Sequence, residues 1–206
     1  YRKLKRETKK AIVKWWLIME NKIKSLFDKN IELHQVAKET LAPKIAQAAD
    51  LIINAYKQGN KVLLCGNGGS AADSQHIAAE LVGRFKKERR GLPAIALTTD
   101  TSIMTAVAND YGYDLLFARQ VEALGDKGDV LIAISTSGNS VNIIRAVETA
   151  KFKGLKTIGF LGSDGGQLKD LVEIPIVVPF EGPDRVQEVH ILIGHIICHL
   201  IDLNIT

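Results

Sequence analysis

The chain has 206 residues, of which 46% are hydrophobic and 24% are charged, so it is long enough for one well-buried α/β domain with a helical extension. No uninterrupted apolar run approaches the ~18 residues that suggest a membrane span. The two cysteines, Cys65 and Cys198, lack the spacings of a zinc site and do not resemble a disulfide framework. These features argue against a membrane partner and favour a reducing, cytoplasmic compartment.

The first 18 residues differ from the rest of the chain in charge. They hold seven basic side chains against Glu7 alone, a net charge of +6, which leaves −2 for residues 19–206 out of the formal total of +4. A slightly acidic main part argues against nucleic acid as a partner. The apolar run in residues 11–19 superficially resembles a signal peptide, but Lys14 interrupts it and no small-residue cleavage site follows. We expect residues 1–18 to be a basic extension, either not native or disordered, and residues 19–206 to form one domain.

Helical periodicity covers residues 20–56, with a break predicted near 40–43 because Pro43 suits a first helical turn. After Gly59, apolar runs typical of buried strands alternate with helical stretches. The predicted strands are 61–65, 94–97, 129–134, 156–161 and 173–178, and the predicted helices are 71–84, 102–109, 113–123, 141–152 and 184–201. This alternation predicts an α/β fold, a three-layer Rossmann-like parallel sheet of about five strands flanked by helices, with N-terminal helices at 20–58. Pro175 cannot donate to a sheet ladder, so the last strand is expected at an edge.

Two Gly/Ser-rich loops directly follow the first and third predicted strands. They are Gly66-Asn67-Gly68-Gly69-Ser70 and Ser135-Thr136-Ser137-Gly138-Asn139-Ser140. Each supplies hydroxyls and main-chain N–H groups at the positive end of a helix dipole, which is a setting that binds anions such as phosphate esters. Ligands of parallel α/β sheets bind beyond the carboxyl ends of the strands, so both loops should face one crevice. The pair indicates a phosphorylated small molecule that carries hydroxyls.

The first loop also satisfies the dinucleotide pattern G-x-G-x-x-A in a formal sense. The acidic residue after the next predicted strand is Asp100, which lies 34 residues after Gly66 rather than about 20. A dinucleotide would also leave the second loop without a role. The sequence therefore favours a sugar phosphate over NAD.

Two polar sets on predicted helices could supply the chemistry. His76 and Glu80 are spaced i, i+4 and share one face of the helix after the first loop, although an isolated pair of this kind is more often a surface hydrogen bond. The last helix carries Asp184, Gln187 and His195 among apolar residues. Gln187 and His195 are ~12 Å apart along the helix axis, so they could converge on something between them but not touch.

The other histidines have simpler expected roles. A single histidine on a largely apolar helix is usually a hydrogen-bonded core residue, and we expect this of His199, with the same alternative open for His195. His34 is expected at the surface. The pattern leaves His190 open.

Eight segments between residues 20 and 203 match the sequence pattern of a known protein family, in the same order and at about the same spacing. They are 65–70, 76–84, 93–96, 109–112, 128–131, 135–140, 164–166 and 184–190. In these segments the chain resembles the bacterial phosphoheptose isomerases, which carry an SIS (sugar isomerase) domain. The resemblance implies an SIS fold for residues 19–206 and a homotetramer in which helices from residues 20–56 pack between subunits. It offers no counterpart for residues 1–18.

The resemblance also implies an activity and the residues that perform it. The activity is conversion of sedoheptulose 7-phosphate to D-glycero-D-manno-heptose 7-phosphate through an enediol(ate), for envelope heptose and lipopolysaccharide biosynthesis. Glu80 and His195 match the acid/base pair, and His76, Glu80, Gln187 and His195 match the ligands of zinc-containing members, with one zinc per subunit. The matching substrate-binding positions are Asn67, Gly68, Gly69, Ser70, Glu80, Asn109, Asp110, Ser135, Thr136, Ser137, Ser140 and Gln187. Arg84 and Asp184 are aligned polar residues without a definite role.

The chemistry of an aldose-ketose isomerase agrees with these assignments. One group must remove a carbon-bound proton and another must manage the oxygen protons, and Glu80 and His195 are the candidates. If Glu80 ligates zinc it is less available as a base, and the sequence leaves this choice open. Two alternatives remain: a non-catalytic SIS scaffold that binds the bacterial replication initiator, and an isomerase of another sugar phosphate. Glu80 and His195 occurring together, with an intact Thr136-Ser137-Gly138 segment, favour the isomerase.

Overall fold

The computed structural model describes the main chain of residues 2–205 and the side chains of residues 14–205. Its centre is one parallel sheet in the order β2-β1-β3-β4-β5. The strands are β1 (Val62–Gly66), β2 (Ala94–Ala96), β3 (Val130–Ser135), β4 (Lys156–Gly162) and β5 (Ile174–Val178). Every residue of β1 and β3 is buried, as expected of central strands that are covered on both faces.

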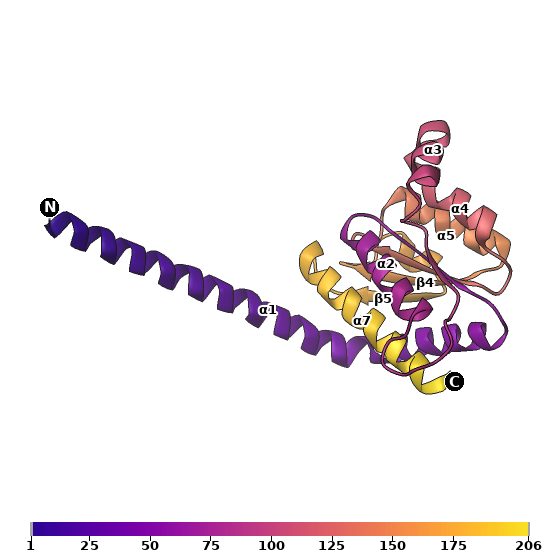
Figure 1. Cartoon of the computed structure of the whole chain (residues 1–206), viewed down its shortest axis with the longest axis horizontal. Coiled ribbons are helices and arrows are strands. Elements are labelled where there is room, and N and C mark those ends of the chain that lie inside the picture. Colours follow the sequence, from indigo (N-terminus) through magenta and orange to yellow (C-terminus); the bar gives the residue numbers. More distant parts are fainter. Residues whose placement is uncertain (1, 206) are drawn as a thin grey trace.

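Helices cover both faces of the sheet and form the outer two layers (Figure 1). They are α1 (Arg2–Lys57), α2 (Gly69–Val82), α3 (Thr101–Tyr111), the 3-10 turn η1 (Tyr113–Leu115), α4 (Leu116–Leu124), α5 (Val141–Lys153), α6 (Leu168–Leu171) and α7 (Pro183–Asn204). One apolar cluster joins the sheet to α1, α2 and α7, and a second joins its other face to α4, α5 and α6. The predicted three-layer fold is therefore confirmed. α3 has no buried residue and stands away from the sheet (Figure 1).

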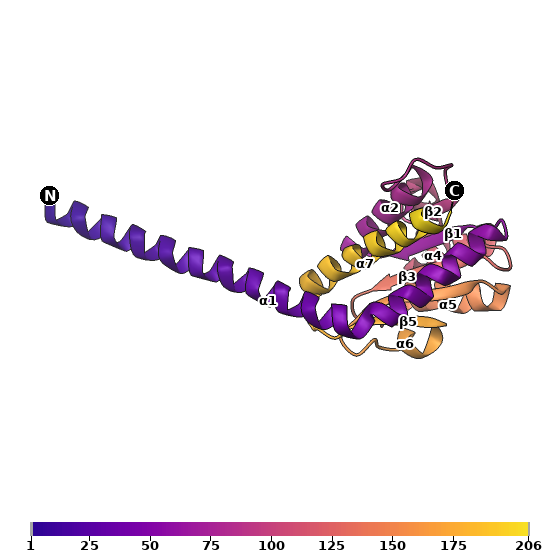
Figure 2. The same ribbon diagram turned by 90° about the horizontal axis from the view of Figure 1, so that it is seen from below.

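The long helix α1 differs from the prediction. It continues through the expected break, with Pro43 inside it. Leu41 and Ile45 are buried on either side of this proline, and their packing against the core offsets the main-chain hydrogen bond that proline removes. The ribbon changes direction where it reaches the globular part, as proline-containing helices commonly do (Figure 2). α1 also crosses the predicted boundary between residues 18 and 19 without interruption, and the division into an extension and a domain stays a prediction.

The first half of α1 projects from the molecule as an arm (Figure 1). Among the residues whose side chains are described, none of α1 is buried before Leu33. Trp16 and Phe27 are large apolar side chains on this arm that are 61% and 66% exposed. The arm is therefore an apolar helix surface that the rest of its own chain does not cover.

Most other elements lie within two residues of their predicted bounds. Pro175 sits in β5, which is the edge strand opposite β2, as predicted. The helix predicted at 113–123 is divided into η1 and α4. The helix α6 was not predicted, because four residues are too few to show helical periodicity.

α7 has the length and composition of a helix that could cross a membrane, with a mean hydropathy of 1.4 over an 18-residue window. Half of that window is buried inside the protein, where α7 packs against α1 and α2. A count of uninterrupted apolar residues does not detect this window, because Gln187 and three histidines occur within the helix. The high hydropathy of α7 comes from the apolar side chains that it buries in the core, although the helix also carries polar residues.

Candidate active site

The two Gly/Ser loops lie next to each other at the carboxyl end of the sheet. They follow β1 and β3, which are adjacent parallel strands. Asn67 in the first loop and Asn142 in the first turn of α5 exchange two amide hydrogen bonds, each 2.9 Å long. The Tyr113 hydroxyl donates to Oδ1 of the same Asn67 over 2.9 Å. These bonds connect the first loop to α5, the helix that follows the second loop.

The second loop gathers hydroxyls at the N-terminus of α5. The Ser135 Oγ atom lies 3.1 Å from Ser140 Oγ and 3.5 Å from Ser137 Oγ. Gly138 has a φ of +65°, and a Cβ there would lie 2.0 Å from the main-chain oxygen of Gly165. Only glycine fits both constraints, so its absence of a side chain lets the loop turn closely enough to bring the serines together. The result is a hydroxyl cluster at the positive end of a helix dipole.

The first loop lies against α7. A Cβ on Gly69 would come 2.6 Å from both amide atoms of the Gln187 side chain, so a larger residue there would displace this amide. Gly68 precedes α2 with a φ of +55°, and Ser70 in the first turn is buried. Gln187 is therefore a neighbour of the loop and of the start of α2.

Three titratable side chains from α2 and α7 meet, on the two helices that contact the first loop or begin in it. His76 Nε2 lies 3.3 Å from Glu80 Oε1 and 3.3 Å from Nε2 of His195. Their candidate ligand atoms all lie within 4.8 Å of one another, which is close enough for one metal ion. The Phe85 ring stacks on His195 at a centroid distance of 5.5 Å. The fold thus brings Glu80 and His195 into one site.

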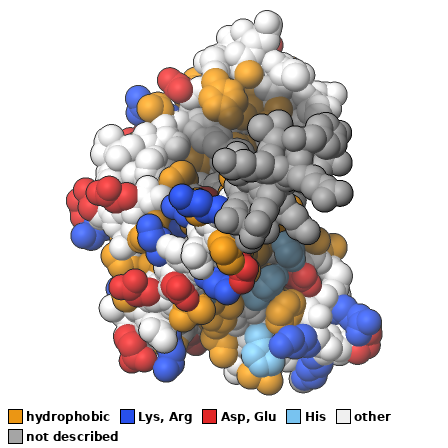
Figure 3. All heavy atoms as spheres, turned by 90° about the vertical axis from the view of Figure 1, so that its left-hand side faces the viewer, with side chains coloured by type: hydrophobic (Ala, Val, Ile, Leu, Met, Phe, Trp, Pro, Cys, Tyr) orange, Lys and Arg blue, Asp and Glu red, His pale blue; other side chains and the backbone are white. Residues whose placement is uncertain are grey.

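The site is open to solvent. The His76 side chain is 47% exposed and that of Glu80 is 25% exposed. Figure 3 shows histidine side chains at the surface on this face, with hydrophobic side chains around them. A small polar molecule could therefore reach the imidazoles directly.

Some predicted site residues lie apart from this group. Asn109 and Asp110 are exposed on α3, where the Asn109 amide donates to the Asp110 carboxylate over 2.8 Å. Among the described side chains, neither residue makes another polar contact. Arg84 pairs with exposed Glu88 at 3.6 Å, and Asp184 contacts the adjacent Arg185.

The remaining histidines have the following positions. His190 is fully buried and its Nε2 donates to the Leu161 carbonyl over 3.0 Å. Burial lowers the pKa of His190 to about 4, so it is a neutral core residue near pH 7. The expectation that His199 is a core residue is wrong: it is exposed one helical turn after His195 and contacts Phe85 ring to edge at 6.4 Å. His34 is half-buried rather than fully at the surface, and its Nδ1 donates to the Asn30 carbonyl over 2.8 Å.

Three residues near the site have no distinctive sequence signal. Asn142 is buried, although an asparagine in a first helical turn normally suggests a solvent-facing polar residue. Tyr113 begins a short 3-10 turn that periodicity does not resolve. Asp73 precedes His76 by almost one turn, and burial raises its pKa to about 6 against the opposing effect of His76. Only the tertiary structure shows that these side chains border the site.

Comparison with known proteins defines the class first. The model of the SIS domain family matches residues 26–162, which is more than half of the chain. Together with the five-stranded parallel sheet and the Ser-rich loop, this shows that the chain belongs to the SIS domain family.

Closer relatives define the group within that family. The phosphoheptose isomerase of a Nitratiruptor species is 64% identical over 164 residues, covering 80% of this chain and 88% of the relative. That of Aliarcobacter butzleri is 56% identical over 184 residues, covering 87% and 97%. The solved phosphoheptose isomerase of Neisseria gonorrhoeae has a TM-score of 0.86 and 43% identity, covering 90% of this chain and 99% of that one. The chain belongs to the phosphoheptose isomerases.

Proposed function

We propose that this protein is an aldose-ketose isomerase that converts sedoheptulose 7-phosphate to D-glycero-D-manno-heptose 7-phosphate in the cytoplasm, for envelope heptose biosynthesis. The observation that carries the proposal is the meeting of Glu80 and His195 at one site, where His76 Nε2 is 3.3 Å from a side-chain atom of each. A carboxylate and an imidazole are the two groups that an enediol(ate) mechanism needs. The names and identities of the relatives support the choice of substrate.

In this proposal, one set of residues binds the phosphate end of the sugar and another acts at the carbonyl end. The hydroxyls of Ser135, Ser137 and Ser140 hold the phosphate at the N-terminus of α5. Glu80 removes a proton from C1 of the ketose and returns it to C2 of the enediol(ate). His195 gives a proton to O2 and takes the proton from O1 as the aldose carbonyl forms. Asn67 presents its amide to the sugar hydroxyls from a position held by Asn142 and Tyr113. Thr136 and the main chain of 68–70 complete the proposed contacts within one subunit. Asn109 and Asp110 lie apart on α3, and we propose that they reach the substrate of a neighbouring subunit.

The same group of side chains fits a divalent metal. His76, Glu80 and His195 offer two nitrogens and an oxygen within 4.8 Å, and the Gln187 amide lies next to the loop that precedes α2. A nitrogen and oxygen donor set suits zinc, and we propose one zinc ion per subunit held by these four residues. When bound, zinc supplies a Lewis acid that polarises the substrate carbonyl. If Glu80 ligates the metal through one carboxylate oxygen, its second oxygen stays free to accept the substrate proton, although the bound carboxylate would be a weaker base.

A turnover assay tests the substrate. Purified protein is supplied with sedoheptulose 7-phosphate, and aldose formation is followed by a coupled enzyme or by NMR. Fructose 6-phosphate and ribulose 5-phosphate serve as the matched shorter substrates. We expect turnover with the heptulose phosphate and much slower reaction with the others. Absence of turnover with all three would contradict the proposal and favour a non-catalytic SIS scaffold.

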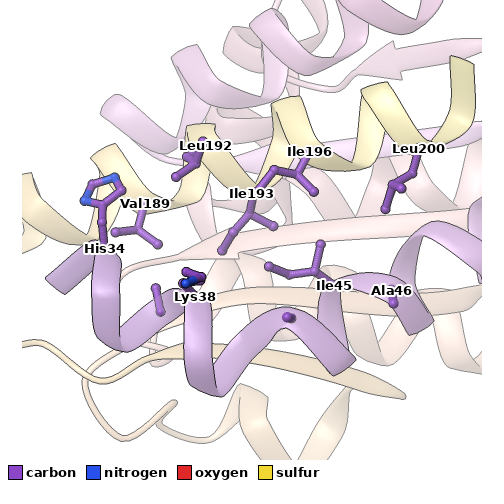
Figure 4. Close-up of a pocket in the computed structure, with 11 residues that line it drawn as sticks. His34, Lys38, Ile45, Ala46, Val189, Leu192, Ile193, Ile196 and Leu200 are labelled. Carbon is purple, nitrogen blue, oxygen red and sulfur yellow. The ribbon is translucent and has the colours of Figure 1, made fainter. Parts of the chain in front are cut away.

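We also propose that the protein is a homotetramer in which the α1 helices pack between subunits. An apolar groove of about 530 Å³ runs between α1 and α7, lined by residues that include Ala42, Ile45, Leu192 and Ile196 (Figure 4). The arm also exposes apolar side chains. If the arm of one subunit packs against another subunit, these side chains are buried, and their burial stabilises the association. Ile196 is adjacent in sequence to His195, so a subunit in this groove would lie close to the catalytic group.

A further inference from the structure

A buried ion pair links α7, which carries His195, to the segment that follows α2, which carries Glu80. Arg89, in the segment after α2, donates from Nε to Asp202 Oδ1 of α7 over 2.7 Å. The other carboxylate oxygen of Asp202 accepts from the main-chain N–H groups of Lys86 and Lys87 at 2.8 and 3.0 Å. The two charged side chains are 0% and 3% exposed, so water does not screen the pair.

The guanidinium of Arg89 also completes the C-terminus of α2. Its terminal nitrogens donate to the carbonyls of Glu80 and Leu81, each over 3.0 Å. The last carbonyls of a helix have no partner within the helix, and a cation there is favourable for the dipole. One of the two carbonyls belongs to the residue whose carboxylate is the proposed base. Arg89 therefore fixes the main chain from which the Glu80 side chain extends.

The same ion pair reaches the second reacting group. The segment that Asp202 holds through Lys86 and Lys87 contains Phe85, whose ring stacks on His195 with an interplanar angle of 25°. On α7, Asp202 lies about two turns after His195. The pair is thus connected to Glu80 through a carbonyl and to His195 through an aromatic contact and a shared helix.

We propose that the Arg89–Asp202 ion pair is a positioning element of the active site, which sets the placement of Glu80 relative to His195. This inference rests on the proposed function. Neither residue touches the substrate site, so their contribution is to geometry, and a small displacement of reacting groups lowers turnover much more than binding.

Asp202→Asn tests the proposal, with Asp129→Asn as a matched control. Asp129 is also a buried carboxylate that accepts from two main-chain N–H groups, of Lys61 and Asp126, and pairs with a cation, Lys61, at 2.7 Å. Asp129 precedes β3 and bonds to the residue before β1, and none of its polar partners lies on α2 or α7. We expect both variants to lose stability to urea, and D202N alone to lose kcat by ~10- to 100-fold with KM within about twofold of the wild type.

A second variant and a second measurement separate positioning from folding. Arg89→Lys keeps a cation for Asp202 but lacks the planar fork that reaches two carbonyls, so it should fold and still lose kcat severalfold. Co²⁺ binding, followed by its visible spectrum, should weaken about tenfold in D202N and stay unchanged in D129N. If D202N and R89K match D129N in kcat and in Co²⁺ affinity, the proposal is overturned. An inactive wild type would instead contradict the proposed function.

Discussion

The Glu80 side chain has a neighbouring imidazole and is partly exposed to solvent. Its carboxylate is 25% exposed and lies 3.3 Å from His76 Nε2. His76 in turn lies 3.3 Å from His195, which is 119 residues later in the chain. The pairing of His76 with Glu80 is predictable from i, i+4 spacing, whereas the approach of His195 depends on how α7 packs on α2.

Replacing Glu80 by Gln removes the proposed proton acceptor and keeps the shape of the side chain. We expect kcat to fall by ~10²-fold or more, because general base catalysis contributes on that scale, while KM changes little. Steady-state kinetics with sedoheptulose 7-phosphate measure both quantities. Glu122→Gln, on the exposed surface of α4, is the control and should keep wild-type kinetics. Near-normal turnover in E80Q would refute the assignment of Glu80 as the base.

Ser137 belongs to the proposed phosphate end of the site. Its hydroxyl is exposed and lies 3.5 Å from Ser135 Oγ. Ser137→Ala removes one hydrogen bond to a charged group, worth about 1.5–3 kcal/mol, so KM should rise by ~10- to 100-fold with little change in kcat. Kinetics over a wide range of substrate concentrations test this. A loss confined to kcat would place Ser137 at the reacting end instead.

At the scale of elements, the contact between α7 and β4 contains a histidine that must stay neutral. His190 donates to the Leu161 carbonyl of β4, and burial lowers its pKa to about 4. An unfolded histidine has a pKa near 6.5, so below that pH the unfolded chain binds a proton that the folded chain excludes. The stability from this group is therefore present above about pH 6.5 and is lost as the pH falls toward 4.

We accordingly expect the free energy of unfolding to fall by ~2 kcal/mol between pH 7 and pH 5 through His190. Urea unfolding at a series of pH values measures the slope. His190→Gln, which can still donate to the Leu161 carbonyl, should be less stable at pH 7 but less sensitive to this pH change. An identical slope in the variant would mean that other groups cause the acid sensitivity.

The elements also differ in how well local patterns predict them. Strands such as β1 and β3 are continuous apolar runs, so their position follows from burial on both faces. Pro43 is the opposite case, because its local signal favours a helix start and the packing of Leu41 and Ile45 overrides that signal. The expectation for His199 is wrong for a related reason: composition alone does not show which side of α7 faces the core.

At the scale of the whole molecule, the exposed arm and the groove between α1 and α7 favour assembly. We expect sedimentation equilibrium to give a mass about four times the 22.6 kDa of one chain. Phe27→Glu should shift the protein toward smaller species, because it places a charge on the apolar surface of the arm. Phe152→Glu, at a side chain that is 93% exposed on α5, is the matched control and should remain a tetramer. A wild-type monomer would contradict the proposed assembly.

The sequence by itself determined the alternation of strands and helices, the two Gly/Ser loops and the His76–Glu80 pair, because each depends on residues close together in the chain. The tertiary structure decided the approach of His195, the Asn67–Asn142 pair and the Arg89–Asp202 link. Each of these joins side chains that are distant in sequence, and no local periodicity records which helix faces will meet. Parallel strands carry consecutive loops to one edge of the sheet, whereas the packing of α7 on α2 completes the site.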